Sequence, residues 1–596
     1  IYMSIKIIGN EKDLPNDVRT HDQLTLLPEK YLSSDPKRPL LLTTSQGEKF
    51  TYALRPLLYS VLAILIIESC EALAYYSINT TEANFLTGHY SPNWNPNMSE
   101  NNAAQFMSGM TAFGSTITLL GGILADGILG DYWNIVLGVS VFLLPGFVLT
   151  WLTTFPDLFG TTFNLNILRA GSLVLMPIGS GLIGCSVNVF GAKQYHPILQ
   201  ADQIEQYYLL FYVVINIGAT FATLVVPVLA RHSMTAAYAI PVVGFIIGMA
   251  VFLAFSRRYV KRPPEKKALV GTFKLIGKNT IRCKSFNTSK KSNGGSFPDS
   301  FVDGVKRLLM IAPICMLVIP FLIVYNTMST IFLFQGNAMR TVAFIDSSWM
   351  SNFDSFAVLV TGAIVSTFVY PALEKRGMRL SLATKISIGT FFVALSMLMA
   401  IIIQIKIHHA YLNDGAKISI LWQIFTYSFI GIGEVFAIST VYEATFTIAP
   451  KEQKALASAI QSFVTGGLSN YICMGLQKVF VAWFPDQNIS DETERWIASR
   501  MTKYFWVLFG IAIFGTILTL LPSIRNWLEC LREDAIEATA LSESSSGNDN
   551  EDEDEDEDKD KDKDEDKHEE EHEYEIENVV EATALLSGSS TIIQLH

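Results

Sequence analysis

Charged residues are scarce in this chain of 596 residues. Only 17% are Asp, Glu, Lys or Arg, against about 25% in typical soluble domains. Half of the residues are hydrophobic and the mean hydropathy is +0.31. So few charges cannot cover the surface of several water-soluble domains. The composition therefore disfavours a soluble enzyme, a disordered protein and a nucleic-acid-binding protein.

Cysteine is also scarce, and recognisable reaction motifs are absent. The six cysteines have neither CxxC pairing nor metal-ligand spacing, so we expect neither a disulfide framework nor a metal site. We find no nucleophile motif and no nucleotide-binding loop. We therefore expect no enzymatic activity and no cofactor.

The net charge of −12 comes from one short segment. Residues 549–577 hold 20 Asp or Glu and 4 Lys, a net of −16. Because the whole chain carries −12, the remainder carries +4 and is slightly basic. The acidic run has no apolar face, so we expect a disordered tail.

Long apolar stretches fill most of the chain. A membrane-spanning helix needs about 20 apolar residues, and twelve stretches qualify. They are 57–77, 104–125, 132–155, 168–192, 207–230, 235–256, 308–333, 353–373, 384–405, 418–447, 456–480 and 504–522. The sequence therefore predicts an all-α membrane protein with twelve transmembrane helices.

A basic segment divides these helices into two sets of six. Residues 257–307 hold 14 Lys or Arg and 3 Asp or Glu, whereas residues 80–103 contain no Lys or Arg. Loops rich in Lys and Arg stay on the cytosolic side, so we expect both termini in the cytosol. Two six-helix halves are the layout of the major facilitator fold, with a substrate site between them. The expected parts are an N-terminal cytosolic segment (1–55), a six-helix bundle (56–256), the linker (257–307), a second bundle (308–522) and a cytosolic tail (523–596).

Two glycosylation sequons agree with this orientation. Asn97 precedes Met-Ser between the first two helices, and Asn488 precedes Ile-Ser between the last two. Both loops are non-cytosolic in the predicted topology, so both asparagines are candidate glycosylation sites.

A few carboxylates lie inside the apolar stretches. A charge at the centre of a membrane helix costs at least about 2.5 kcal/mol, and such residues usually face a cavity. Glu68 and Glu71 are three residues apart and share one helical face. Glu434 follows two glycines and is the second cavity candidate, whereas Glu443 is nearer the cytosolic end and could snorkel. Histidine is absent from the interior of every predicted span, so any proton transfer would depend on carboxylates.

Five segments resemble the proton-dependent oligopeptide transporter family, which includes the plant nitrate and peptide carriers. The first helix reads Glu68-Ser-Cys-Glu71-Ala72-Leu-Ala-Tyr75-Tyr76, similar to the family's ExxER motif followed by an aromatic and Tyr-Tyr-Gly. The other four are GGILADGILGDYWNI (121–135), FYVVINIGA (211–219), YNTMSTIFLFQGNAM (325–339) and residues 422–459 around GIGEVF. The matches occur in order and within the predicted helices. The resemblance implies a major facilitator fold and proton-driven symport of di- and tripeptides or a related small solute.

The resemblance also implies roles for individual residues. Glu68 and Glu71 would be the proton-coupling sites, and Asp126 would help to hold a gate closed. The substrate cavity would be lined by Tyr75, Tyr76, Asn216, Tyr325 and Glu434, of which Glu434 would bind a substrate amine.

Two cations of the family pattern are missing. The arginine of ExxER is Ala72 here, and the lysine of the fourth helix is Gly184. An Arg or Lys binds a carboxylate as a charge-assisted pair. With both cations gone and the three glutamates kept, we expect a negative cavity that prefers amine-bearing solutes to anions.

Two short motifs concern the membrane in which the protein resides. Leu26 and Leu27 follow Asp22, and Leu585 and Leu586 follow Glu581. Both patterns are similar to acidic dileucine signals, which sorting adaptors read to direct proteins to lysosomes or vacuoles. The sequence leaves open the plasma membrane or a lysosomal or vacuolar membrane. It also leaves open two other functions, a transporter-derived nutrient sensor or scaffold and an uncoupled facilitator.

Overall fold

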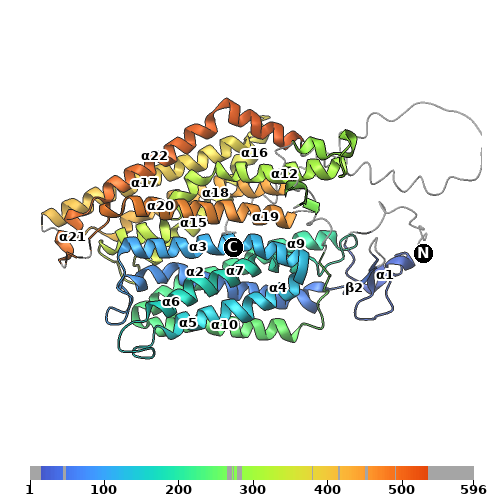
Figure 1. The fold of residues 1–596 in the computed structure, drawn as a ribbon, viewed down its shortest axis with the longest axis horizontal. Helices are drawn as coiled ribbons and strands as arrows, with labels where there is room; N and C mark the ends of the chain where they lie inside the picture. The colour runs from blue at the N-terminus through green and yellow to red at the C-terminus, as the bar shows by residue number, and fades with distance from the viewer. Residues whose placement is uncertain are drawn as a thin grey trace, which may run out of the picture.

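The computed structural model describes residue 15 and residues 17–43, 48–264, 271–272, 274–277, 279, 285–378, 380–413, 416–449, 454–486, 488–489 and 491–534. Most of these residues are helical, and the long helices run in roughly the same direction (Figure 1). Two bundles lie side by side, coloured blue to green for the first half and green-yellow to red for the second.

The first half contains six long helical segments. They are η3–α2 (Leu57–Val61, Leu62–Leu86), α3–η4 (Glu100–Leu124, Ala125–Leu129), α4–η5–α5 (Asp131–Leu137, Gly138–Leu143, Leu144–Leu152), α6–η6–α7–α8 (Leu165–Leu168, Arg169–Leu175, Met176–Gly184, Val187–Ala192), α9 (Ala201–His232) and α10 (Met234–Ala254). The η segments in this half are short π-helical stretches within longer helices.

The second half contains six more. They are α12–α13–η9–α14 (Asp299–Met316, Ile319–Tyr325, Met328–Phe332, Leu333–Asn337), η10–α15–η11–α16 (Trp349–Ser351, Asn352–Ile364, Val365–Val369, Tyr370–Glu374), α17 (Leu382–Leu412), η12–α18 (Ile420–Trp422, Gln423–Ile448), α19–η14–α20 (Lys454–Ser462, Phe463–Leu468, Ser469–Val479) and α22 (Met501–Leu520). Short helices flank them: η7 (Phe286–Ser289), η8 (Lys291–Asn293), η15 (Val481–Trp483) and α21 (Glu492–Ala498).

Eleven helices among the described residues are long and apolar enough to cross a membrane. The twelfth predicted span corresponds to α19–η14–α20. Its polar residues, among them Gln461, Asn470 and Gln477, are buried, which shows that they face the protein interior. The expected all-α membrane architecture with the major facilitator layout is confirmed.

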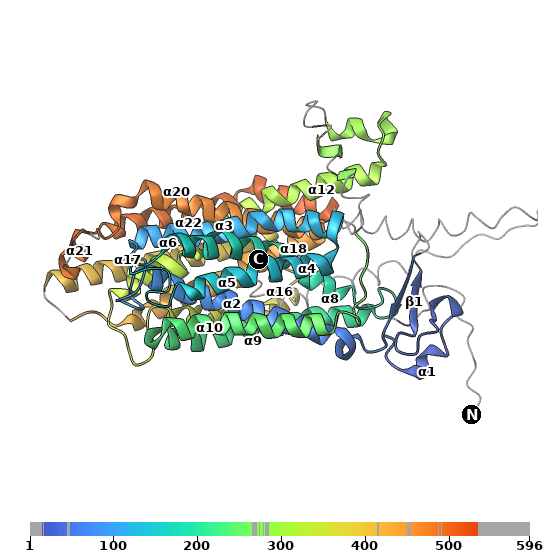
Figure 2. The same ribbon diagram turned by 60° about the horizontal axis from the view of Figure 1, so that its bottom comes forward.

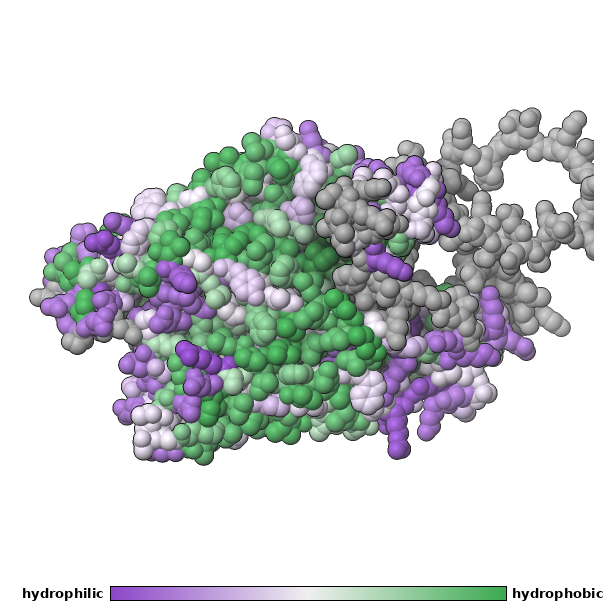
Figure 3. All heavy atoms as spheres, viewed as in Figure 1, coloured by the Kyte–Doolittle hydropathy of each residue, from purple (hydrophilic) through white to green (hydrophobic). Residues whose placement is uncertain are grey.

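The flank of the bundle is hydrophobic. Large apolar side chains such as Phe368, Phe514 and Ile217 are more than half exposed, and Figure 3 shows a mainly hydrophobic face between hydrophilic ends. In water such a surface would promote aggregation. In a bilayer it is the expected lipid-facing surface.

The seventh helix is broken twice. It is interrupted at residues 317–318 and again at residues 326–327. Pro320 explains the first break, because proline cannot donate an internal hydrogen bond and clashes with the preceding turn. The helix also begins at Asp299, ahead of the expected position 308, so its first turns belong to the segment that was predicted as linker.

A small folded unit occupies one end of the molecule, formed by residues 17–43 and 48–54. It contains α1 (His21–Leu24), η2 (Glu29–Tyr31) and a hairpin of β1 (Leu40–Thr43) and β2 (Lys49–Tyr52), in which Leu40 pairs with Tyr52. Figure 2 shows it beside the ends of the first-half helices. We call this part the N-terminal unit, and the sequence did not predict that it would fold.

His196 joins the N-terminal unit to the bundle through contacts with Tyr31, Leu41 and Tyr52. It lies between α8 and α9, its ring meets those of Tyr31 and Tyr52 edge-on, and its Nε2 is 3.3 Å from the Leu41 carbonyl oxygen. Its Nδ1 accepts from the backbone N–H of Leu199. Burial lowers the pKa of His196 from about 6.5 to about 4, so the ring is neutral at pH 7 and Nε2–H donates to Leu41.

Candidate functional site

A cavity of about 920 Å³ lies between the two halves. Helices α2, α3 and α9 line it from the first half, and α13, η9, α15, α18 and α20 line it from the second. Three residues expected in the substrate cavity, Tyr75, Tyr76 and Tyr325, are among its lining residues.

Asp354 is the carboxylate that lines this cavity. It lies in the first turn of α15, its side chain is buried, and its Oδ1 has no hydrogen-bond partner among the described residues. The sequence reasoning missed it, although an acid within the eighth apolar stretch was a visible signal. An unpaired buried carboxylate is costly unless a proton or a cation compensates it.

Glu434 lies just behind Asp354. It is outside the cavity lining and 2% exposed, and it is within electrostatic range of both Asp354 and Tyr325. A Cβ added at Gly431, one turn earlier on α18, would lie only 3.1 Å from Asp354 Oδ1. The glycine therefore lets α15 approach α18 closely enough for the two carboxylates to be neighbours.

Asn216 is not among the residues that line the central cavity. It is partly buried on α9. That helix packs tightly on α2, because a Cβ at Gly218 would lie 2.3 Å from the Ser69 carbonyl oxygen and 3.2 Å from the Ala72 Cβ. Ala72, which is 1% exposed, therefore faces a close helix–helix contact.

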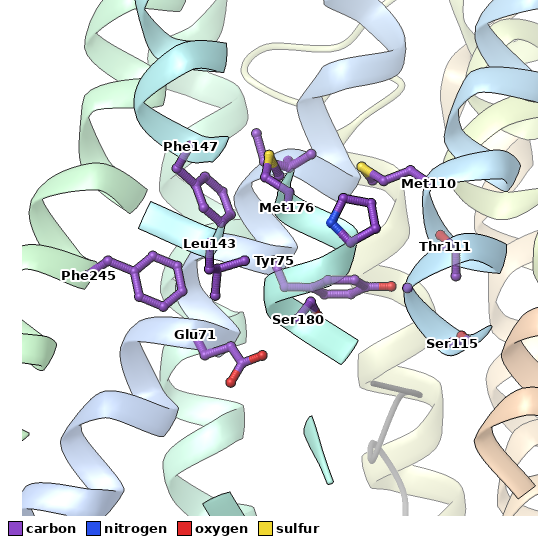
Figure 4. Close-up of a pocket in the computed structure, with 13 residues that line it drawn as sticks. Glu71, Tyr75, Met110, Thr111, Ser115, Leu143, Phe147, Met176, Ser180 and Phe245 are labelled. Atoms are coloured by element: carbon purple, nitrogen blue, oxygen red, sulfur yellow. The ribbon is translucent and has the colours of Figure 1, made fainter. Parts of the chain in front are cut away.

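Glu71 lines a second cavity inside the first half, of about 560 Å³. Figure 4 shows Tyr75 extending across it toward Thr111 and Ser115, with Glu71 beneath. Tyr75 and Thr111 also line the central cavity, so they separate the two spaces. Glu68, one turn before Glu71 on α2, is likewise buried and interacts with it electrostatically.

Polar contacts close the central cavity at the end away from the N-terminal unit. Asn84 Nδ2 donates to Ser348 Oγ at 2.8 Å, and Asn337 Nδ2 donates to Asn84 Oδ1 at 2.8 Å. The Tyr90 hydroxyl donates to Asp346 Oδ2 at 2.6 Å. These contacts join the first half to the second, and we call this cluster the gate.

Ion pairs flank the gate. Arg231, at the end of α9, lies 3.7 Å from Asp346, and its Nη1 donates to the Phe344 carbonyl oxygen. Arg495 lies 3.6 Å from Glu100. Each pair spans the two halves, so opening this end requires breaking both.

At the opposite end two ion pairs among the described residues of the bundles each stay within one half. Asp131 is buried and bonds Lys193 at 2.7 Å. Glu443 pairs with Lys385 at 2.7 Å, so it is neutralised in place. Asp126 lies in η4, and its side chain is outside the described residues.

The remaining predicted residues are peripheral. Asn97 lies in the loop between α2 and α3, Asn488 lies in the loop between η15 and α21, and both are exposed. Leu26 is 59% exposed, whereas Leu27 is buried in the core of the N-terminal unit. Leu585 and Leu586 lie outside the described residues.

Comparison with known proteins gives consistent family matches. The model of the POT family matches residues 132–497, more than half of the chain. The chain is 27% identical to Protein NRT1/PTR FAMILY 8.1 of Arabidopsis thaliana, over 71% of this chain and 87% of that protein. It is 25% identical to Peptide transporter PTR2 of Saccharomyces cerevisiae, over 67% of this chain and 70% of that protein.

Solved structures share the fold. An auto-inhibited POT family peptide transporter aligns with a TM-score of 0.63 at 20% identity, over 77% of this chain and 95% of that one. A POT family transporter in complex with 5-aminolevulinic acid aligns with a TM-score of 0.59 at 17% identity, over 78% of this chain and 96% of that one.

Proposed function

Because this chain belongs to the POT family of membrane transporters, we propose that it is a secondary transporter that couples a small amine-bearing solute to protons. The observation that carries the proposal is the placement of buried carboxylates on both sides of one central cavity. Glu68 and Glu71 lie on the first half, and Asp354 and Glu434 lie on the second. Di- and tripeptides and related amines are the solutes that we propose.

The second half supplies the amine site. Asp354 lies in the cavity wall with Glu434 behind it. A substrate ammonium placed at Asp354 would compensate a carboxylate whose Oδ1 otherwise has no hydrogen-bond partner among the described residues. Tyr325, which interacts with both acids, would position the same group with its hydroxyl.

The first half supplies the proton site. Glu68 and Glu71 are both nearly inaccessible and are one turn apart. Two carboxylates that share such a site cannot both ionise without a large electrostatic cost, so the pair holds a proton until the surroundings change. Closing and opening the gate changes those surroundings, which couples proton release to the movement of the solute.

Uptake into proteoliposomes tests this function. We expect an inward acid gradient to drive uptake of alanyl-alanine amide, and we expect Glu71→Gln to abolish the gradient dependence. Glu71→Asp keeps an ionisable carboxyl, so it should retain part of the gradient-driven uptake while Glu71→Gln retains none. This matched pair separates loss of the titratable group from damage to the helix.

The same experiment distinguishes the alternatives. Uptake of equal rate with and without the gradient would replace the symporter by an uncoupled facilitator. Binding without any uptake would favour a nutrient sensor or scaffold derived from a transporter.

A further inference from the structure

The charge of the central cavity is one-sided. Asp354 is the acidic lining residue, and the described lining contains no Lys, Arg or His. Three basic side chains elsewhere in the bundle are engaged in ion pairs: Arg231 pairs with Asp346, Lys193 with Asp131 and Lys385 with Glu443. A carboxylate entering this cavity would therefore meet a like charge and no cation.

The first half provides no cation at residue 72, which lies on one of the helices that line the cavity. Ala72 lies on α2, the helix that also bears Tyr75 and Tyr76, but it is 1% exposed and packs against α9. Gly218 of α9 allows the two helices to approach closely at this point. At residue 72 the first half therefore presents a buried methyl group and no cation.

Uncharged hydroxyls dominate the rest of the wall. Ten of the 21 lining residues are Ser or Thr, and three are Asn. Four tyrosines add aromatic faces with further hydroxyls, while only Met107, Met328 and Leu333 are aliphatic. Several of these hydroxyls, among them those of Thr80, Thr111 and Thr223, already donate to backbone carbonyls of their own helices, and their oxygens can still accept hydrogen bonds. The wall therefore suits a solute whose hydroxyls donate to these oxygens and suits a bulky apolar one poorly.

We propose that the preferred solute is a hydroxyl-bearing amine without a free carboxylate. This proposal rests on the transport function proposed above, because it takes the central cavity as the path of the solute. The ammonium binds at Asp354, and the hydroxyls bind along the serine- and threonine-rich wall. An unmodified peptide is disfavoured, because its terminal carboxylate is left without a partner in a cavity that already holds an acid.

Binding to the purified full-length protein in detergent tests the proposal with two matched probes. D-Glucosaminitol and D-glucosaminic acid carry the same amine and differ only at C1, which is a hydroxymethyl group in the first and a carboxylate in the second. We expect calorimetry to show glucosaminitol binding at least about tenfold more tightly. Equal binding, tighter binding of the acid, or no binding of glucosaminitol would each overturn the proposal, as would tighter binding of seryl-serine.

A change of wall charge gives a second, independent measurement. Met107 lines the cavity from α3, and Lys matches its length with an added cation. We expect Met107→Lys to tighten glucosaminic acid binding about tenfold. A Met107→Lys protein that elutes and unfolds like the parent but keeps the original ratio would refute the assignment of this cavity.

Failure here can be told apart from failure of transport. The binding preference is read without a membrane gradient, so the expected ratio together with absent uptake would defeat the transport function alone. Gradient-driven uptake of seryl-serine in preference to glucosaminitol would leave the transporter in place and defeat the proposed substrate class.

Discussion

Tyr90→Phe should weaken the gate by a predictable amount. The substitution removes a hydroxyl that donates to the Asp346 carboxylate at 2.6 Å across the two halves. A hydrogen bond to a charged group contributes about 1.5–3 kcal/mol. Asp346 keeps the Trp349 backbone N–H at 3.0 Å and Arg231 at 3.7 Å, so we use the lower value.

A loss of about 1.5 kcal/mol corresponds to a shift of about tenfold in an equilibrium constant. Because the bond joins the two halves only when this end is closed, the shift favours the state that is open at the gate. A cysteine placed in the cavity reports that state. Ser355→Cys is suitable, since Ser355 lines the cavity from α15, and Cys530→Ser removes the exposed thiol found among the described residues.

The assay is the alkylation rate with a membrane-impermeant maleimide added at the gate side. We expect Tyr90→Phe to raise the rate about tenfold. Tyr411→Phe is the matched control: its hydroxyl donates to Glu492 Oε1 at 2.9 Å, but both residues belong to the second half. The reasoning is refuted if Tyr90→Phe labels like the parent, or if Tyr411→Phe accelerates labelling equally.

Three further predictions concern folding and sorting. Unfolded His196 takes up a proton below about pH 6.5 but the folded form only near pH 4, so stability is full at high pH and is lost on acidification. The protection factors of the β1 and β2 amides, which correct for the pH dependence of intrinsic exchange, should fall about tenfold between pH 7.5 and 5.5, and His196→Gln should remove that dependence. Gly218→Ala places a methyl group 2.3 Å from a carbonyl oxygen of α2 and should destabilise by about 1–3 kcal/mol, whereas Gly510→Ala meets no atom within 4 Å and should leave the unfolding temperature within a degree or two of the parent's. Leu27→Ala should lower the stability of the N-terminal unit by about 2–5 kcal/mol while Leu26→Ala should not; if instead both redirect a tagged protein equally without any loss of stability, the pair acts as a sorting signal and not as part of a core.

The transmembrane helices could be predicted from the sequence, whereas their exact boundaries and the fold of the N-terminal unit could not. The apolar stretches were long enough to predict their helices from sequence, because a bilayer leaves few other options for a backbone. The boundary at Asp299 and the breaks around Pro320 were less accessible, since they depend on where the helix meets its neighbours. The N-terminal unit was missed because its short strands and turns are stabilised by packing on Leu199 and Val260, which lie far away in sequence.

The candidate site was predictable only in part. Tyr75, Tyr76 and Tyr325 could be nominated from motifs, and the cavity lining includes them. Asn216 and Glu434 could be nominated equally well, yet they lie outside that lining. Whether a helical residue faces a cavity or a neighbouring helix depends on how the helix is rotated, and a motif carries no information about that rotation.

The sequence by itself determined that this protein spans a membrane with two six-helix halves, that its acidity belongs to one tail, and which few carboxylates the membrane segments contain. Hydrophobicity and charge are additive along a chain, so they can be read without coordinates. Only the tertiary structure decided that Asp354 is the acid of the cavity wall, that Ala72 is closed in by α9, and that Tyr90 and Asp346 hold the gate. Those facts depend on distances between segments hundreds of residues apart, and close packing of the helices sets those distances.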